Sequence, residues 1–600
     1  MTADVRFAAL DYVVFVSMLL VSLAIGVYSS LRGKGAASTQ AFLLGGREMS
    51  VAPVALSLVG GVISAISILG LPTEMYLYGT QLTTNIIGLI VGVMVVKHVF
   101  LPIVYPLKLV SIYEYIELRF KSRTLRKLAM ACWLMASCMY LGSCLYAPSL
   151  ALLSVTGLPP WASILSMGLV CAVYISIGGV KAVVYTDVVQ TLLMFGGVVT
   201  VVAVSCKDLG GLGGVLQIAD RGGRLEFFNT DPSPFARHTL WSTIVLGFYT
   251  AFSVTGTSQS QYQRFASVKT LADAQRLCSL FSVGVLLLWG VFYTSGLVAY
   301  AVYSDCDPLT AGRIQKADQI IPYLVADKLS HLTGLTGLFV AAVYGGVLSS
   351  LSSQCNAMAC IVWEDFLKER PYFQAFSDRS ATNVVKILSA IMGMVGIGMA
   401  FVVGNLGTIN HVIYAIDGAI GGPLCGLFFI GIFAPWVSTK GAFVGLFLSF
   451  VFNLWIGLGR FVVGGKAPVR LPLSVDACAD DLLATPTSSF NATFSAILNN
   501  TASASLDATE ALPQTSSHTI YDLSYCYNGA IGIIMNFVIS SIASLCTGPL
   551  LPGEIRSDLV HPPCSKLYRR LCSFLGLRLE DNSEKEFAEK EVTISMLPAK

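Results

Sequence analysis

Residues 337–366 read GLFVAAVYGGVLSSLSSQCNAMACIVWEDF, and they set how the rest of the chain is interpreted. The stretch is long enough to cross a bilayer, which takes about 20 helical residues. Four hydroxyl side chains nevertheless follow a pair of glycines at its centre: Gly345, Gly346, then Ser349, Ser350, Ser352 and Ser353. Hydroxyl oxygens, with carbonyls freed at a glycine, suit a small hard cation. Close packing of membrane helices through small residues is the alternative.

The composition indicates an all-α, polytopic membrane protein. Of the 600 residues, 54% are hydrophobic and only 12% are charged, about half the charged fraction of soluble domains. Apolar blocks of membrane-spanning length predict about 13 transmembrane helices between residues 10 and 549. The net charge of +3 comes without a basic patch interleaved with aromatics, so a nucleic-acid partner is not expected. The lipid bilayer is the expected partner, and no protein partner can be inferred.

Lysine and arginine residues predict the orientation, because they concentrate in cytoplasmic loops. If the expected spans alternate, the basic loops after the first, third and seventh spans share one side with the segment beyond residue 549. They contain Arg32, Lys34, Arg47, Lys108, Arg119, Lys121, Arg123, Arg126, Lys127, Arg264, Lys269, Arg556, Lys566, Arg569 and Arg570. We therefore expect a cytoplasmic C-terminus, an extracellular N-terminus, a membrane domain over 1–549 and a polar, solvated tail over 550–600.

The predicted extracellular loop at 464–526 offers an independent check. It contains two N-x-Thr sequons, at Asn491 and Asn499, which can be glycosylated only on the lumenal or extracellular side. Both positions are therefore predicted glycosylation sites. The loop also contains Cys478 and Cys526, and a disulfide between them is a hypothesis for this oxidising side.

Two expected spans carry signs of a broken helix. Residues 57–67 combine Gly60-Gly61 with several serines, and residues 254–261 read VTGTSQSQ, which is very polar for a bilayer. Interrupted spans at matching positions of two halves indicate a transporter site built from inverted repeats. Glycines that serve only helix packing are the alternative.

Two carboxylates fall inside expected spans, at Asp187 and Asp417. A carboxylate at membrane depth is costly and therefore suggests a functional site. For Asp187 an interfacial position at the membrane edge is the alternative. No Walker A, HExxH, G-x-S-x-G, paired CxxC or potassium-filter sequence is present, so neither an enzyme nor a potassium channel is expected.

Several long motifs together resemble the sodium/solute symporter family, from about residue 10 to 550. They include PVALSLVGGVISAISILGLPTEMYLYGTQ at 53–81, SIYEYIELRF at 111–120, GGVKAVVYTDVVQ at 178–190, DPSPFARHTLW at 231–241 and QSQYQRF at 259–265. The second and fourth look like the branch of sodium-coupled monocarboxylate, multivitamin and iodide carriers. The resemblance implies a five-plus-five inverted repeat of the LeuT type, here over about 50–205 and 238–434.

The resemblance also implies two sites. Carried over by position, one sodium ion would take the carbonyls of Gly60, Ile63 and Gly346 and the hydroxyls of Ser349 and Ser350, with Asp187 close by to hold or release it. The substrate would lie between the two broken helices, near Ser64, Ser67, Tyr140, Ser258 and Gln261. The chain departs from the family pattern at Gly60-Gly61, where Ala-Ser or Ala-Thr is usual and the hydroxyl at 61 is lost. It also departs at Ser258 in place of the usual asparagine, at Ser67 in place of the iodide branch's glutamine, and at Asp417.

The sequence therefore predicts a plasma-membrane symporter that couples Na⁺ to a small organic anion, either a monocarboxylate or a carboxylate-bearing vitamin such as biotin or pantothenate. The alternatives are a carrier of iodide or another small solute, a channel, and a solute sensor of the same fold that has lost transport. A few pocket side chains decide the cargo, so the fold does not choose among them.

Overall fold

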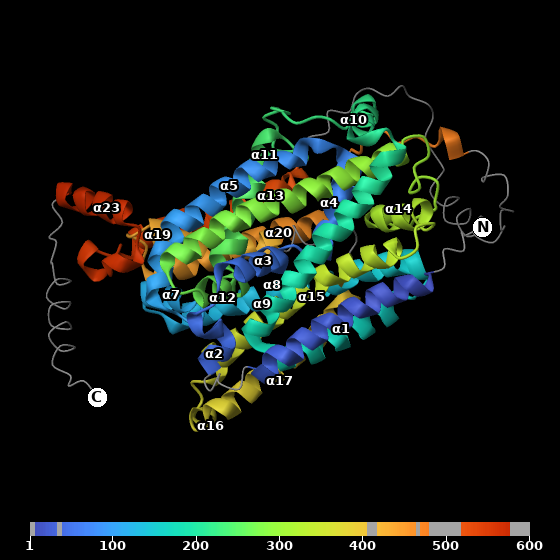
Figure 1. The fold of residues 1–600 in the computed structure, drawn as a ribbon. Helices are drawn as coiled ribbons and strands as arrows, with labels where there is room; N and C mark the ends of the chain where they lie inside the picture. The colour runs from blue at the N-terminus through green and yellow to red at the C-terminus, as the bar shows by residue number, and fades with distance from the viewer. Residues whose placement is uncertain (1–6, 33–38, 405–416, 464–468, 479–517, 576–600) are drawn as a thin grey trace, which may run out of the picture.

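The computed structural model describes residues 7–32, 39–404, 417–463, 469–478 and 518–575. Over these residues the chain is helical throughout and contains no β-strand (Figure 1). The α-helices are α1 (Ala9–Arg32), α2 (Thr39–Leu44), α3 (Val51–Val62), α4 (Ala65–Tyr78), α5 (Asn85–Val95), α6 (Leu101–Val104), α7 (Glu114–Phe120), α8 (Arg123–Thr156), α9 (Pro160–Asp208), α10 (Gly211–Arg221), α11 (Leu240–Phe252), α12 (Gln259–Ser267), α13 (Leu271–Val302), α14 (Ile320–Lys328), α15 (Leu335–Ile361), α16 (Pro371–Gln374), α17 (Asp378–Val403), α19 (Gly422–Phe433), α20 (Thr439–Val463), α22 (Asn528–Thr547) and α23 (Pro562–Phe574). The predicted all-α class is confirmed.

Nine stretches of the described residues are long and apolar enough to cross a membrane, or ten if one bent pair counts as a span. This is fewer than the 13 expected from apolar length. The difference lies in spans that are broken or short, such as α3 with α4, the first part of α9 at 160–173, and 418–433 around α19. Within α9 the backbone leaves helical geometry at Gly179, with φ 62°, which separates the spans expected at 160–178 and 181–205.

The helix that contains the serine cluster, α15, lies at the centre of the bundle. Almost all of its residues are buried, and it packs against α9, α8, α17 and α1. Large apolar side chains of the outer helices face outward instead, for example Leu286 and Leu287 on α13. A helix bundle that is apolar on its outside is expected where lipid is the surrounding solvent.

Both helix breaks predicted from the sequence are present. The first lies between α3 and α4, where Ile63 and Ser64 have extended backbone geometry. The second follows the π-helical segment η5 (Ser253–Thr257), where Ser258 is extended before α12 begins. Because α12 packs on both α3 and α15, the two breaks face the same central helix.

The disulfide hypothesis for the outer loop is wrong. Cys478 pairs with Cys306, whose Cα atom is 5.2 Å away, and Cys526 is a buried free thiol. Cys478 and Cys526 belong to the same loop in the sequence, but the segment 469–478 lies along the loop after α13, which contains Cys306. Asp307 N donates to Ser474 O, and Ala477 N donates to Asp305 O. The sequons at Asn491 and Asn499 lie outside the described residues.

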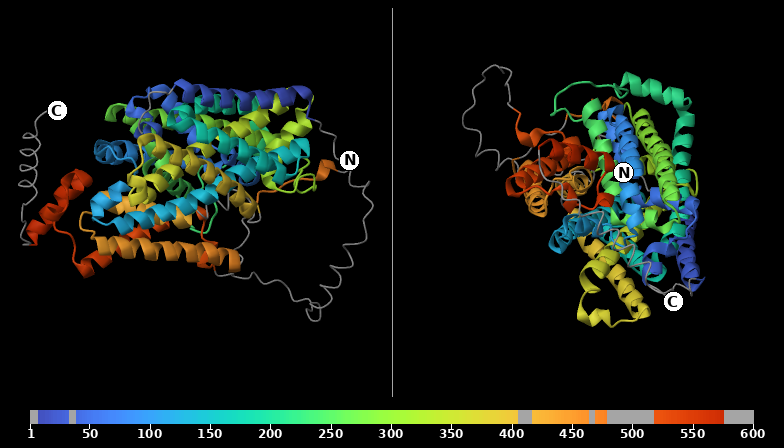
Figure 2. Two further views of the ribbon diagram at one scale, coloured as in Figure 1. Left: turned by 90° about the horizontal axis from the view of Figure 1, so that it is seen from below. Right: turned by 90° about the vertical axis from the view of Figure 1, so that its left-hand side faces the viewer.

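Different helices lie at the two ends of the bundle. The helices α2, α7, α16 and α23 gather at the left end in Figure 1, whereas α10, α14 and the start of α1 lie at the right end. The C-terminal helices α20 and α22 stand together at one side, as the end-on view in Figure 2 shows.

Part of the segment expected to be a solvated tail is folded against the bundle. Leu550 N donates to Trp436 O, His561 N donates to Ile432 O, and the Tyr115 hydroxyl donates to Leu559 O. Residues 550–561 therefore cap the end of α19 rather than forming a free tail.

Candidate sodium and solute site

A buried ion pair lies beside the first helix break. Asp187 on α9 is fully buried, and its Oδ2 accepts hydrogen bonds from Ser57 Oγ at 2.6 Å and from Arg264 Nη2 at 2.8 Å. The carboxylate is therefore enclosed between helices and does not lie on the surface of the bundle. Burying two charges is costly unless both are well hydrogen-bonded, and Arg264 also contacts Ser353 Oγ and donates from Nη1 to Ser260 O at 2.9 Å.

Sequence reasoning missed the role of Arg264. It counted this residue among the basic charges of a cytoplasmic loop, but only 4% of its side chain is exposed. The signal that could have found it is the carboxylate itself, because a charge inside a membrane segment needs a partner. The arginine lies six residues beyond the break at Ser258, so it links the second broken helix to α9.

The structure brings the expected sodium residues together around the first break. The two glycines lie close to residues of the other helices. A Cβ added to Gly60 would lie 3.0 Å from Ser349 Oγ, and a Cβ added to Gly346 would lie 3.3 Å from the backbone of Ser64 and Ala65. The carbonyl of Ile63 lies at the same break. The amide of Ser67, which would bond to that carbonyl in a continuous α-helix, donates to the carbonyl of Ser64 instead.

Several oxygens at this place are uncommitted. Ser349 Oγ, Ser350 Oγ and Asp187 Oδ1 are buried and form no hydrogen bond with a described residue, although the Ser349 hydroxyl lies close to the Asp187 carboxylate. A buried polar atom without a partner costs about 1–3 kcal/mol. Neutral and anionic oxygens of this kind suit a hard monovalent cation, which would satisfy them together.

The two glycines that depart from the family pattern have a steric reason. A Cβ on Gly60 would lie 2.1 Å from Thr191 Oγ1, and one on Gly61 would lie 2.9 Å from Arg264 Nη2. The small residues therefore make room for a threonine and for the buried guanidinium. The side chain of Asp417 lies outside the described part of the structure.

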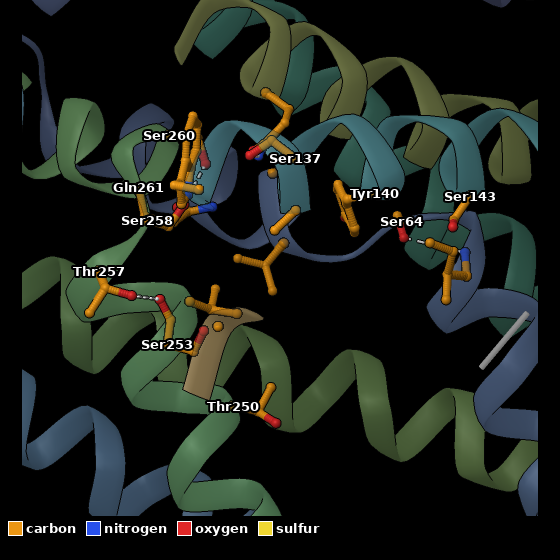
Figure 3. A pocket seen from close by; sticks show the side chains of 18 of the residues that line it. Ser64, Ser137, Tyr140, Ser143, Thr250, Ser253, Thr257, Ser258, Ser260 and Gln261 are labelled. Atoms are coloured by element: carbon orange, nitrogen blue, oxygen red, sulfur yellow. Dashed lines mark hydrogen bonds between the residues drawn. The ribbon is translucent and has the colours of Figure 1, made fainter. Parts of the chain in front are cut away.

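A cavity of about 230 Å³ lies between the two breaks, and it is lined by all five residues predicted to contact the solute. Figure 3 shows Ser64, Tyr140, Ser258 and Gln261 around it, with further hydroxyls from α8 and η5. The remaining predicted residue, Ser67, is on α4. The volume is below the ~300–1,000 Å³ typical of drug-sized ligands, so the cavity suits a small solute.

The described lining contains no charged side chain. Its polar character comes from hydroxyls, from amides such as Gln261, whose Oε1 has no hydrogen-bond partner among the described residues, and from two helix N-termini. Both α4 and α12 begin at the cavity, after Ser64 and Ser258. Helix N-termini present free N–H groups and a positive dipole end, which favour an anion.

Tyr140 lies between the cavity and the uncommitted serines. The residue lines the cavity, and its hydroxyl lies next to the hydroxyls of Ser64 and Ser350. A group that occupies the cavity and a cation at Ser350 would therefore share one neighbour. Such a shared contact is a physical route for coupling between two binding sites.

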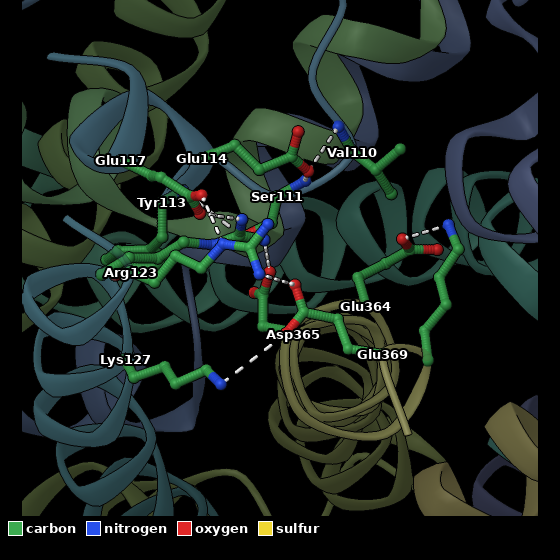
Figure 4. A network of polar contacts seen from close by, with 12 residues as sticks. Val110, Ser111, Tyr113, Glu114, Glu117, Arg123, Lys127, Glu364, Asp365 and Glu369 are labelled. Carbon is green, nitrogen blue, oxygen red and sulfur yellow. Dashed lines mark hydrogen bonds and ion pairs between the residues drawn. The ribbon is translucent and has the colours of Figure 1, made fainter. Parts of the chain in front are cut away.

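An ion-pair network holds the other end of the central helices (Figure 4). Asp365, in the π-helical segment η7 (Val362–Leu367) that follows α15, pairs with Arg126 on α8. Arg126 Nη1 also lies 2.8 Å from Glu117 Oε2 on α7. Lys127 Nζ lies 3.7 Å from Glu369 Oε2. The network links the end of α15 to α7 and α8, at the end where the basic loops lie.

These features define a class: a helical secondary transporter with two broken helices that meet at a central cavity beside buried, unpaired oxygens. The chain belongs to the Sodium:solute symporter family, whose defining pattern matches residues 42–449. It is therefore a sodium-coupled solute transporter and not an enzyme.

Named relatives cover most of the chain. It is 37% identical over 552 residues to the sodium-coupled monocarboxylate transporter 1 of Homo sapiens, and the matched region covers 90% of this chain and 88% of the relative. It is 36% identical over 564 residues to the sodium-dependent multivitamin transporter of Oryctolagus cuniculus, over 94% and 86% of the two chains.

The fold is also that of a solved transporter. The substrate-bound, outward-open structure of a Na⁺-coupled sialic acid symporter superposes with a TM-score of 0.70 at 21% identity, over 91% of this chain and 99% of that one. The predicted five-plus-five architecture is confirmed at the level of the fold.

Proposed function

We propose that this protein imports a small organic anion, foremost a short monocarboxylate, together with sodium across the plasma membrane. The observation that carries the proposal is the set of uncommitted buried oxygens at Asp187, Ser349 and Ser350, which adjoin an uncharged cavity of small volume. The names of the relatives, for monocarboxylates and for vitamins, support the same class of cargo.

Sodium occupies the first break in this proposal. The carbonyls of Gly60, Ile63 and Gly346 and the hydroxyls of Ser349 and Ser350 coordinate it, and Asp187 lies beside them. The solute occupies the cavity at Ser64, Ser67, Tyr140, Ser258 and Gln261. Its carboxylate takes hydrogen bonds from hydroxyls and from the N-termini of α4 and α12, because no basic side chain of the described chain lines the cavity.

In the same proposal, the guanidinium of Arg264 competes with sodium for the carboxylate of Asp187. Its guanidinium holds Oδ2 of Asp187, and a cation that approaches Oδ1 meets a carboxylate whose charge is already shared. Loss of sodium leaves Asp187 paired with Arg264, and sodium binding weakens that pair. Because Arg264 belongs to α12, the exchange also reaches the helix that begins at the cavity.

The energy available from sodium is sufficient for import. A tenfold gradient provides about 1.4 kcal/mol per ion, and 100 mV adds about 2.3 kcal/mol per net charge. Two sodium ions with one monoanion would provide roughly 5 kcal/mol, enough for on the order of a thousandfold accumulation. The transport cycle is alternating access around the fixed midplane site.

An uptake panel in cells or proteoliposomes tests the cargo. Lactate, nicotinate, biotin, pantothenate, iodide, glucose and choline are supplied as radiolabelled solutes, with sodium or with a large inert cation. We expect saturable lactate and nicotinate uptake that requires sodium. Uptake of glucose or choline alone would contradict the organic-anion proposal, and flux that neither saturates nor depends on sodium would indicate a channel.

We further propose that the N-terminus is extracellular and the C-terminus cytoplasmic. The basic loops support this orientation, and the helices adjoining them gather at one end of the bundle. The double substitution Asn491→Gln with Asn499→Gln tests it, since glycans are added only on the lumenal side. We expect the double variant to run at a lower mass than the wild type on a gel. If the two run at the same mass, and an endoglycosidase does not change the mass of the wild type, the outer loop is not glycosylated and the proposal is contradicted.

A further inference from the structure

The helix α23 exposes an apolar stripe that nothing in the described chain covers. Leu567, Leu571 and Phe574 are 70%, 53% and 87% exposed, and Leu575 directly after the helix is 63% exposed. Their spacing of four, three and one residues places them on one side of the helix. Four large apolar side chains on a 13-residue helix are unusual for a water-facing surface.

Basic side chains occupy a neighbouring side of the same helix. Lys566, Arg569 and Arg570 lie within one and a half turns, and the helix contains no acidic residue. None of the three forms an ion pair with another described residue. A helix with one apolar side and one basic side is the pattern of a segment that lies in a membrane surface.

The third side of α23 attaches it to the bundle. The Tyr568 hydroxyl donates to Leu550 O at 2.7 Å, and its ring lies 6.0 Å from the ring of Trp436. Leu550 is three residues beyond the end of α22, and Trp436 is three residues beyond the end of α19. The helix α22 is long and apolar enough to span a membrane, and tryptophan and tyrosine favour the membrane interface. This contact places α23 beside the ends of α19 and α22, at the left end of the bundle in Figure 1.

We propose that α23 lies on the bilayer surface and binds anionic phospholipid headgroups. The lysine and the two arginines contact the phosphates, while the leucines and Phe574 enter the boundary of the acyl chains. The acidic segment 580–591, EDNSEKEFAEKE, is the other candidate occupant. It could neutralise the basic side, but with Phe587 as its single large apolar residue it cannot cover the four-residue stripe.

Hydrogen–deuterium exchange of the full chain in lipid nanodiscs tests the proposal. We expect the amides of 562–575 to exchange about tenfold more slowly in discs containing phosphatidylserine than in purely phosphatidylcholine discs, since each basic residue near such a surface contributes favourably. The triple variant Lys566→Gln, Arg569→Gln, Arg570→Gln should lose the dependence on phosphatidylserine. Lys440→Gln, an exposed lysine at the start of α20, is the matched control and should retain it.

A second variant separates the apolar contribution. Leu567→Ser with Leu571→Ser should speed exchange of α23 in both kinds of disc. Equal exchange of wild-type α23 in neutral and anionic discs would overturn the proposal. Protection that disappears when residues 580–591 are deleted would also overturn it, because the chain's own acidic segment would then be the occupant.

Discussion

The guanidinium of Arg264 donates a hydrogen bond to the carboxylate of Asp187 across 2.8 Å in the interior of the membrane domain. The pair joins the second broken helix to α9 and lies beside the first break. Its two partners are 77 residues apart in sequence, and both are almost fully buried. Each charge is tolerated only because the other is present.

The first prediction concerns this pair. Asp187→Asn leaves the guanidinium of Arg264 buried without a counter-charge, so we expect a loss of about 3–5 kcal/mol of stability and strongly impaired sodium coupling. Adding Arg264→Gln should recover part of the stability but not the coupling. Thermal unfolding of the purified protein measures the first effect and sodium-dependent uptake the second. Strictly additive destabilisation by the two substitutions would contradict the pairing.

The second prediction concerns the uncommitted serines. Ser349→Ala with Ser350→Ala removes two proposed ligands, and we expect the sodium concentration for half-maximal uptake to rise about tenfold or more, which corresponds to about 1.4 kcal/mol. Surface expression should persist. Ser352→Ala is the matched control, because its hydroxyl is already bonded to the Ser349 carbonyl at 3.1 Å. An unchanged sodium requirement in the double variant would contradict the ligand assignment.

The third prediction concerns Tyr140, whose hydroxyl lies next to both Ser64 and Ser350. Tyr140→Phe should raise the KM for solute and the half-maximal sodium concentration together, because one hydroxyl serves both sites. Uptake measured over a grid of the two concentrations shows whether both shift. Tyr185→Phe is the control, since that side chain is exposed. A shift in KM alone would restrict Tyr140 to the solute cavity.

The fourth prediction concerns the tight contact at Gly60. Gly60→Ala should destabilise the protein by about 1–3 kcal/mol, as overpacking does. The gain of about 0.5–1 kcal/mol expected for alanine in a helix does not offset this loss, since the new Cβ would lie 2.1 Å from Thr191 Oγ1. Thr191→Ala should rescue the variant, because the nearest remaining atom of residue 191 is then its Cβ at 3.5 Å. Thermal unfolding of the three variants decides the matter, and failure of the rescue would disprove this contact as the cause.

The fifth prediction concerns pH. His238 lies in the loop before α11, with Nε2 2.9 Å from the Tyr525 hydroxyl and 3.8 Å from Glu74 Oε2. Burial, and then the neighbouring Arg237, lowers the pKa of His238 well below its ordinary value of 6.5. Just below pH 6.5 the unfolded chain therefore binds more protons than the folded one, so stability is complete above this pH and falls as the pH drops below it.

Unfolding temperatures at about pH 7.5 and pH 5.5 test this sign. The wild-type protein should lose stability on acidification, and His238→Gln should lose less. His331→Gln, at an exposed histidine, should behave like the wild type. If His238→Gln loses as much stability as the wild type, the buried histidine is not the cause.

The sequence by itself determined the membrane class and the position of both helix breaks, and its resemblance to the symporter family implied five of the residues that line the cavity. These features follow from local properties: apolar length, glycine and hydroxyl clusters, and motif patterns that a single chain displays. Tertiary structure alone decided the pairings, namely Arg264 with Asp187, Cys478 with Cys306, and the small residues at 60 and 61 with Thr191 and Arg264. Each pairing joins residues far apart in sequence, and only the packing of helices around α15 determines which of many compatible side chains come within contact distance.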